Sequence, residues 1–90
     1  DIATSLSYIG NVYDKKGDYN KAFEYYEKSY EIRKIVYADN PNHPDIAANL
    51  NNIASVYFNK GDLVKALENY KKSYNIYNKI YSNNQNHADI

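Results

Sequence analysis

The sequence predicts an all-α protein, a right-handed α-α superhelix (solenoid) of two helix-turn-helix units with four helices. Two observations predict this fold. Residues 1–44 align on residues 45–88 without a gap, and half of the 44 aligned positions are identical. Apolar residues in each unit also recur at spacings of three and four, which is the period of one helix face. Repeats of this length normally stack so that neighbouring units cover each other's apolar faces.

The repeat sets the expected unit boundaries. Unit 1 spans 1–44, with helices over about 2–16 and 19–38, and unit 2 spans 45–88, with helices over about 46–60 and 63–82. The sequence His87-Ala88-Asp89-Ile90 matches His43-Pro44-Asp45-Ile46, so residues 89–90 would begin a truncated third unit. We therefore interpret the chain as part of a longer array.

The first helix of each unit begins beside an aspartate, Asp1 or Asp45, which suits an N-cap or the first turn because the helix dipole is positive there. Glycine inside a helix costs about 0.5–1 kcal/mol relative to alanine, so Gly10 predicts that another backbone comes close to this helix. The predicted buried stripe consists of apolar and small residues at equivalent positions: Ile2, Leu6, Ile9, Gly10 and Tyr13, then Ile46, Leu50, Ile53, Ala54 and Tyr57.

The second helix of each unit follows a two-residue hinge. Gly17 and Gly61 can adopt the positive φ that commonly ends a helix, and Asp18 and Asp62 follow as N-caps. Such a short hinge predicts an antiparallel hairpin. The predicted buried side contains Tyr19, Ala22, Phe23, Tyr26, Ser29, Tyr30 and Val36 or Tyr37, and in unit 2 Leu63, Ala66, Leu67, Tyr70, Ser73, Tyr74 and Ile80 or Tyr81. Prolines and asparagines predict a turn at residues 39–44.

These residues carry a family resemblance. Leu6-x2-Ile9-Gly10-x2-Tyr13 followed by Ala22-x3-Tyr26 resembles the tetratricopeptide repeat signature, and unit 2 repeats it from Leu50 to Tyr70. The usual period is about 34 residues, so a 44-residue period implies a longer second helix and loop. Residues 43–54 look like the longer repeat of kinesin light chains and related signalling arrays.

The resemblance implies an adaptor that binds a partner peptide or helix in a concave groove lined by the first helix of each repeat. Thr4 and Ala48 would also face this groove. Asparagine side chains can pair with both the N–H and the C=O of a peptide backbone, and varied aromatic residues can anchor a ligand or pack against neighbours. The candidate peptide-binding residues are Ser7, Tyr8, Asn11, Lys15, Asn51, Asn52, Ser55, Phe58 and Asn59. Ser7 stands where chaperone-binding relatives have lysine, which disfavours an acidic chaperone tail as the ligand.

Two alternatives remain open. Tyr70, Tyr74, Tyr77 and Tyr81 form a face of the last helix that a following unit would cover, so copies of the chain could self-associate by head-to-tail stacking. Less favoured is RNA binding, as in similar helical-hairpin arrays, because the net charge is zero.

Composition and motifs disfavour several other classes. Eleven basic and eleven acidic residues cancel, which argues against nucleic-acid and anionic-membrane partners. The sequence has no cysteine, its two histidines are isolated, and it lacks nucleophile-elbow and phosphate-loop motifs. We therefore predict no enzyme, no metal site and no cofactor. Without a signal-peptide pattern or a long apolar run, a cytoplasmic location is the default expectation.

Overall fold

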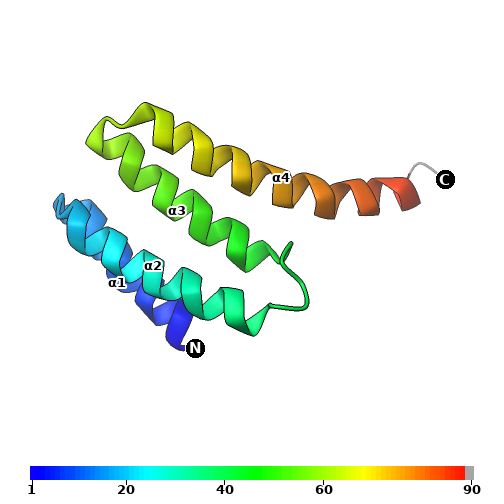
Figure 1. The fold of residues 1–90 in the computed structure, drawn as a ribbon, viewed down its shortest axis with the longest axis horizontal. Coiled ribbons are helices and arrows are strands. Elements are labelled where there is room, and N and C mark those ends of the chain that lie inside the picture. The colour runs from blue at the N-terminus through cyan, green and yellow to red at the C-terminus, as the bar shows by residue number, and fades with distance from the viewer. Residues whose placement is uncertain (89–90) are drawn as a thin grey trace.

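The computed structural model describes the backbone of residues 1–88 and the side chains of residues 1–82. Within these residues the chain forms four α-helices and no strand: α1 (Ile2–Lys16), α2 (Tyr19–Val36), α3 (Pro44–Lys60) and α4 (Leu63–Ala88). The helices α1 and α2 form one antiparallel hairpin and α3 and α4 form another, and α2 packs on α3 to join them (Figure 1). The all-α prediction is confirmed.

The hairpin hinges are closed by the residues that the sequence indicated. Gly17 and Gly61 end α1 and α3 in the left-handed conformation, with φ of 82° and 90°. Asp18 caps α2 by accepting a hydrogen bond from the Lys21 amide at 3.3 Å, and Asp62 accepts an equivalent bond from the Lys65 amide at 3.2 Å. Each hinge therefore satisfies backbone groups on both of its helices.

Three helix ends differ from the prediction. The helix α2 ends at Val36 rather than near residue 38, and α3 begins at Pro44 with His43 as its N-cap, so Asp45 lies in the first turn. The helix α4 continues to Ala88, past the predicted end near residue 82. Unit 1 has Pro41 and Pro44 in its turn, whereas the equivalent positions of unit 2 hold Gln85 and Ala88, which do not break a helix. The predicted start of a third unit at 89–90 lies outside the described residues.

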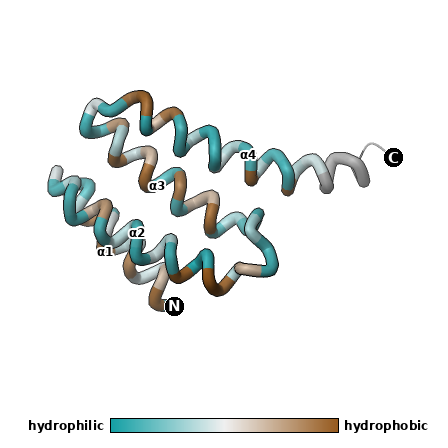
Figure 2. Tube along the Cα trace, viewed as in Figure 1, coloured by the Kyte–Doolittle hydropathy of each residue, from teal (hydrophilic) through white to brown (hydrophobic). Residues whose placement is uncertain are grey.

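The predicted buried stripe of the first helices holds for α3 but not for all of α1. Ile46 and Ile53 are 5% and 7% exposed, whereas their equivalents Ile2 and Ile9 are 72% and 40% exposed. The reason is packing: α3 lies between α2 and α4, whereas α1 has a described neighbour hairpin on one side only. Brown apolar segments of α1 accordingly lie on the open edge of the molecule in Figure 2.

Equivalent residues of the second helices also differ in burial, here because α4 lies at the opposite edge of the molecule from α1. Tyr26 is buried and Tyr30 is half-buried on α2, whereas their equivalents Tyr70 and Tyr74 on α4 are exposed. Leu63 and Leu67 of the predicted buried side are also exposed. The helix α2 is covered by α3, and no described helix covers α4 in the same way. The predicted burial is therefore wrong for Ile2 and Ile9 of α1 and for Leu63, Leu67, Tyr70 and Tyr74 of α4, because no described helix covers these parts of the two faces.

Gly10 is explained by a side chain rather than by the backbone that the sequence led us to expect. A Cβ atom at Gly10 would lie 2.7 Å from Cδ1 and 2.8 Å from Cε1 of the Tyr26 ring. Tyr26 belongs to the central cluster with Ala22, Ile53 and Val56, which spans α2 and α3. The missing side chain at Gly10 therefore makes room for the largest residue of this core.

Candidate interaction surfaces

The predicted groove residues form two equivalent stripes along the first helices. Thr4, Tyr8, Asn11 and Lys15 recur every three or four residues on α1, and Ala48, Asn52, Ser55 and Asn59 occupy the positions 44 residues later on α3. These eight residues are called the first-helix surface below. The Asn59 side-chain amide donates a hydrogen bond to Asp14 Oδ1 at 3.1 Å, which joins the carboxyl-terminal halves of the two helices. The stripes therefore belong to neighbouring helices.

The exposure of these residues is uneven. Tyr8 is 65% exposed and Asn11, Lys15 and Asn59 are also exposed, whereas Asn52 and Ser55 are half-buried. Two further predicted residues flank the α3 stripe: Asn51 is half-buried and Phe58 is exposed. Tyr8 and Phe58 are thus aromatic side chains accessible on the first helices.

Ser7 differs from the predicted groove residues because it is buried against α2. Its hydroxyl lies 2.8 Å from the Ser29 hydroxyl. Ser29 donates its own proton to the Ala3 carbonyl at 2.7 Å and accepts from the Asn49 amide at 3.0 Å, so Ser7 is the donor of the pair. The side chain of Ser7 therefore holds α1 against α2 and is not presented to a ligand.

Asn11 has an internal contact as well. Its Oδ1 accepts a hydrogen bond from the buried Tyr26 hydroxyl. Burial, with a smaller contribution from the negative charge of Asp14, raises the pKa of Tyr26 to about 12. Because the side-chain carbonyl of Asn11 accepts the hydrogen bond of a core tyrosine, substitution of Asn11 would disturb the core and the surface together.

A buried polar network joins three helices, and the sequence alone did not reveal it. Arg33 of α2 is buried and donates from Nη1 to Asn49 Oδ1 of α3 at 2.5 Å and from Nη2 to Thr4 Oγ1 of α1 at 3.1 Å. Its Nη1 also lies 3.3 Å from the Asp45 carbonyl. Burying a charge is costly unless it is hydrogen-bonded, and three neutral acceptors take hydrogen bonds from this guanidinium. The position equivalent to Arg33 is Tyr77, so the network interrupts the repeat, and that interruption was the available signal.

The predicted self-association tyrosines lie along one side of α4. Tyr77 and Tyr81 stack with their ring centroids 6.3 Å apart, and Tyr74 is 65% exposed. Tyr74, Tyr77, Asn78 and Tyr81 line a shallow depression of about 470 Å³. Tyr70 lies one turn before Tyr74 and is 39% exposed. Three of the four tyrosines are therefore exposed along this side of α4, and Tyr77 is half-buried between them.

His43 has a structural role at the start of α3. Its Nδ1 accepts a hydrogen bond from the Asp45 amide at 3.0 Å, and its ring stacks on Tyr37 with centroids 3.6 Å apart. The side chain of His87 lies outside the described residues. Within the described part of the chain, no three histidine, cysteine, aspartate or glutamate residues come together as metal ligands, and no helix is long and apolar enough to cross a bilayer.

Comparison with known families agrees with this architecture. A family model described as Tetratricopeptide repeat matches residues 1–79, which include all of the first three helices and more than half of α4. Comparisons with curated proteins and with solved structures gave no match. Tetratricopeptide repeats are generally protein-protein interaction modules and are typically non-catalytic. The helical hairpins, their 44-residue repetition and the family match together establish that this chain belongs to the tetratricopeptide repeat family.

Proposed function

We propose that this chain binds a segment of a partner protein along the first-helix surface. The observation that carries the proposal is the register of the two stripes: Tyr8 and Asn52 occupy equivalent positions, as do Lys15 and Asn59. A ligand lying across α1 and α3 would meet an exposed aromatic ring, amide groups and one cation. Each neutral hydrogen bond contributes only about 0.5–1.5 kcal/mol net, so several such contacts and an aromatic anchor are needed together.

The proposed contacts are narrower than the set taken from the sequence. The proposed ligand contacts are five residues of the first-helix surface, Tyr8, Lys15, Asn52, Ser55 and Asn59, together with the flanking Asn51 and Phe58. Ser7 is omitted because it is buried, and Asn11 is kept only as a neighbour because it supports Tyr26. The proposed contacts are therefore polar apart from two aromatic residues, Tyr8 on α1 and Phe58 on α3.

The test uses a displayed library of 12-residue peptides selected against the chain, followed by titration of one selected peptide. We expect the amide resonances of the first-helix surface to shift, and we expect Tyr8→Ala with Asn52→Ala to raise the dissociation constant at least tenfold. Asn20→Ala, at an exposed position of α2, is the matched control and should change the dissociation constant less than twofold. Shifts confined to α2 and α4 would contradict the proposal.

A second candidate function, head-to-tail self-association, is favoured by the two open edges. The contact between α2 and α3 joins unit 1 to unit 2, and α4 and α1 carry the equivalent residues of those two faces. A second copy could therefore place its α1 on α4 in the way that α3 lies on α2. Such a contact is heterologous and can propagate from copy to copy.

A further inference from the structure

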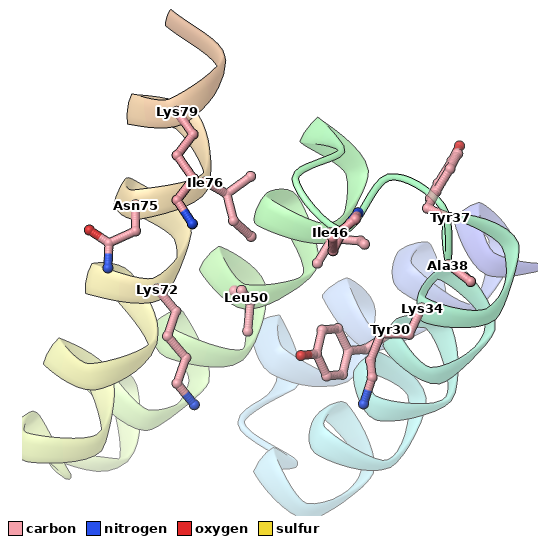
Figure 3. Close-up of a pocket in the computed structure, with 11 residues that line it drawn as sticks. Tyr30, Lys34, Tyr37, Ala38, Ile46, Leu50, Lys72, Asn75, Ile76 and Lys79 are labelled. Carbon is pink, nitrogen blue, oxygen red and sulfur yellow. The ribbon is translucent and has the colours of Figure 1, made fainter. Parts of the chain in front are cut away.

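A cleft lies between the two second helices, on a surface separate from the first-helix surface. The helices α2 and α4 form its walls and α3 forms its floor, in a cavity of about 440 Å³ (Figure 3). Ile46 and Leu50 of α3 and Ile76 of α4 supply apolar side chains to its interior. We call this cavity the second-helix cleft.

The rim of the second-helix cleft is basic. Lys34 stands on the α2 wall, and Lys72 and Lys79 stand on the α4 wall (Figure 3). None of the residues that line the cleft is acidic. Lys34 forms an exposed ion pair with Glu31 at 3.6 Å, whereas the ion pairs found within residues 1–82 do not involve Lys72 or Lys79. Although the whole chain has no net charge, this cleft therefore attracts anions.

The equivalent surface of unit 1 has the opposite charge. Leu6, Lys28 and Ile32 occupy the positions of Leu50, Lys72 and Ile76, but the depression that they line also contains Glu24, Glu27 and Glu31. The apolar interior is thus repeated in the two units while the charge of the rim is not. The basic rim is a property of the second-helix cleft and not of every repeat.

The interior of the cleft favours a helical ligand over an extended one. Apart from the lysines, its lining residues with polar side chains are Asn75, Tyr30 and Tyr37, and the Tyr37 hydroxyl already donates to Asp45. An extended peptide presents a backbone N–H and C=O at every residue, and these groups need partners when they are buried. An α-helix satisfies them internally and presents only side chains, so the few polar groups of this cleft suit a helix.

We propose that the second-helix cleft binds an acidic amphipathic helix of a partner protein. The apolar face of that helix packs on Ile46, Leu50 and Ile76, and its carboxylates lie beside Lys72 and Lys79 on one edge and Lys34 on the other. Lys72 and Lys79 are seven residues apart, about 10.5 Å along α4, so acidic residues two turns apart on the partner match them. This partner would use a surface different from that of a ligand on the first helices.

The test titrates the chain into a fluorescein-labelled 18-residue helical peptide with leucines at helical spacing and glutamates on both edges. We expect saturable binding that weakens with added salt, and methyl resonances of Ile46, Leu50 and Ile76 that shift in proportion to saturation. Lys72→Glu with Lys79→Glu should weaken binding at least tenfold. A matched peptide with lysine in place of glutamate should bind this variant better than it binds the natural chain.

The control variant is Lys21→Glu with Lys65→Glu, which makes the same change in net charge at exposed, equivalent positions near the starts of α2 and α4. It should change the affinity less than twofold. Equal weakening by both variants would mean general electrostatic attraction and would overturn the proposal. Absence of binding, or shifts on the first-helix surface in place of the cleft methyl groups, would also overturn it. Circular dichroism of each variant verifies that the fold is kept.

Discussion

At the scale of single residues, the contacts of Tyr26 connect core packing with the first-helix surface. Its ring fills the space above Gly10, and its hydroxyl donates to Asn11. The sequence predicts that Tyr26 and Ser29 are buried because both follow the helical period. It does not predict that Ser7 is buried, because neighbouring helix positions differ by about 100° and the facing direction depends on tertiary packing. Arg33 was missed for a related reason, since its partners lie on two other helices.

Gly10→Ala should destabilise the fold by about 1 kcal/mol, because overpacking costs about 1–3 kcal/mol and alanine recovers about 0.5–1 kcal/mol of helix propensity. Urea unfolding measures the change. The control compares Ser5→Gly with Ser5→Ala at an exposed position of the same helix. The alanine variant should be the more stable of the two. A Gly10→Ala variant more stable than the natural chain would disprove the role of the Tyr26 ring.

The raised pKa of Tyr26 predicts a loss of stability at alkaline pH. The phenol titrates at about 12 in the folded chain and near 10 when unfolded, so between these values the folded state binds more protons. Its contribution is therefore constant below pH 10 and is lost as the pH rises toward 12, with a total of at most about 2–3 kcal/mol because water screens part of the effect. Urea unfolding from pH 8 to pH 12 measures this loss.

Tyr37 contributes to the same alkaline range, because its hydrogen bond to Asp45 raises its pKa. Tyr26→Phe should flatten the dependence of stability on pH between 10 and 12, and adding Tyr37→Phe should flatten it further. An unchanged slope in the Tyr26→Phe variant would contradict the assignment.

At the scale of helices, the sequence predicts the number, the order and most of the ends. Gly17 and Gly61 fix two ends because only a residue tolerant of positive φ fits there, and aspartates cap the helices that follow. The ends that it misplaces depend on neighbours: the α3 cap is a histidine held against Tyr37, and α4 continues where the turn of unit 1 has prolines. Stop signals inferred from one repeat need not transfer to the next.

His43→Ala should destabilise the chain by about 1 kcal/mol, the typical cost of losing an N-cap. The variant loses both the bond from the Asp45 amide and the stacking on Tyr37. His43→Asn restores a cap acceptor without the stacked ring and should recover part of the loss, as measured by thermal unfolding. Equal stability of the alanine variant and the natural chain would rule out the capping role.

At the scale of the whole molecule, the repeat predicts the architecture, but it does not predict which faces are covered. Equivalent isoleucines are buried on α3 and exposed on α1, because burial depends on neighbours outside the unit. The charge of the two second-helix surfaces also departs from the repeat. The residues that are identical in the two units therefore define the scaffold. The neighbouring helices and the residues that differ decide which surfaces are left exposed and what charge they carry.

Self-association through the open edges predicts that the apparent mass rises with concentration. Covering a large apolar side chain contributes about 1.5–3 kcal/mol, and exposed side chains on both α1 and α4 can contribute. In sedimentation equilibrium, Tyr74→Glu with Tyr81→Glu should shift the chain to monomer. Asn51→Glu with Phe58→Glu is the control: it makes the same change in charge on α3, which is not an open edge, and should leave the mass unchanged. A monomer at all concentrations from micromolar to millimolar would exclude this assembly.

The position of α3 between two helices also determines the order in which the chain opens. Its backbone amides are shielded on two sides, and many of its side chains are buried. Local opening costs least where few buried contacts are lost, so hydrogen exchange should be slowest in α3 and faster in α1. Native-state exchange would then reveal a gradient of local stability along a chain whose sequence is nearly symmetric.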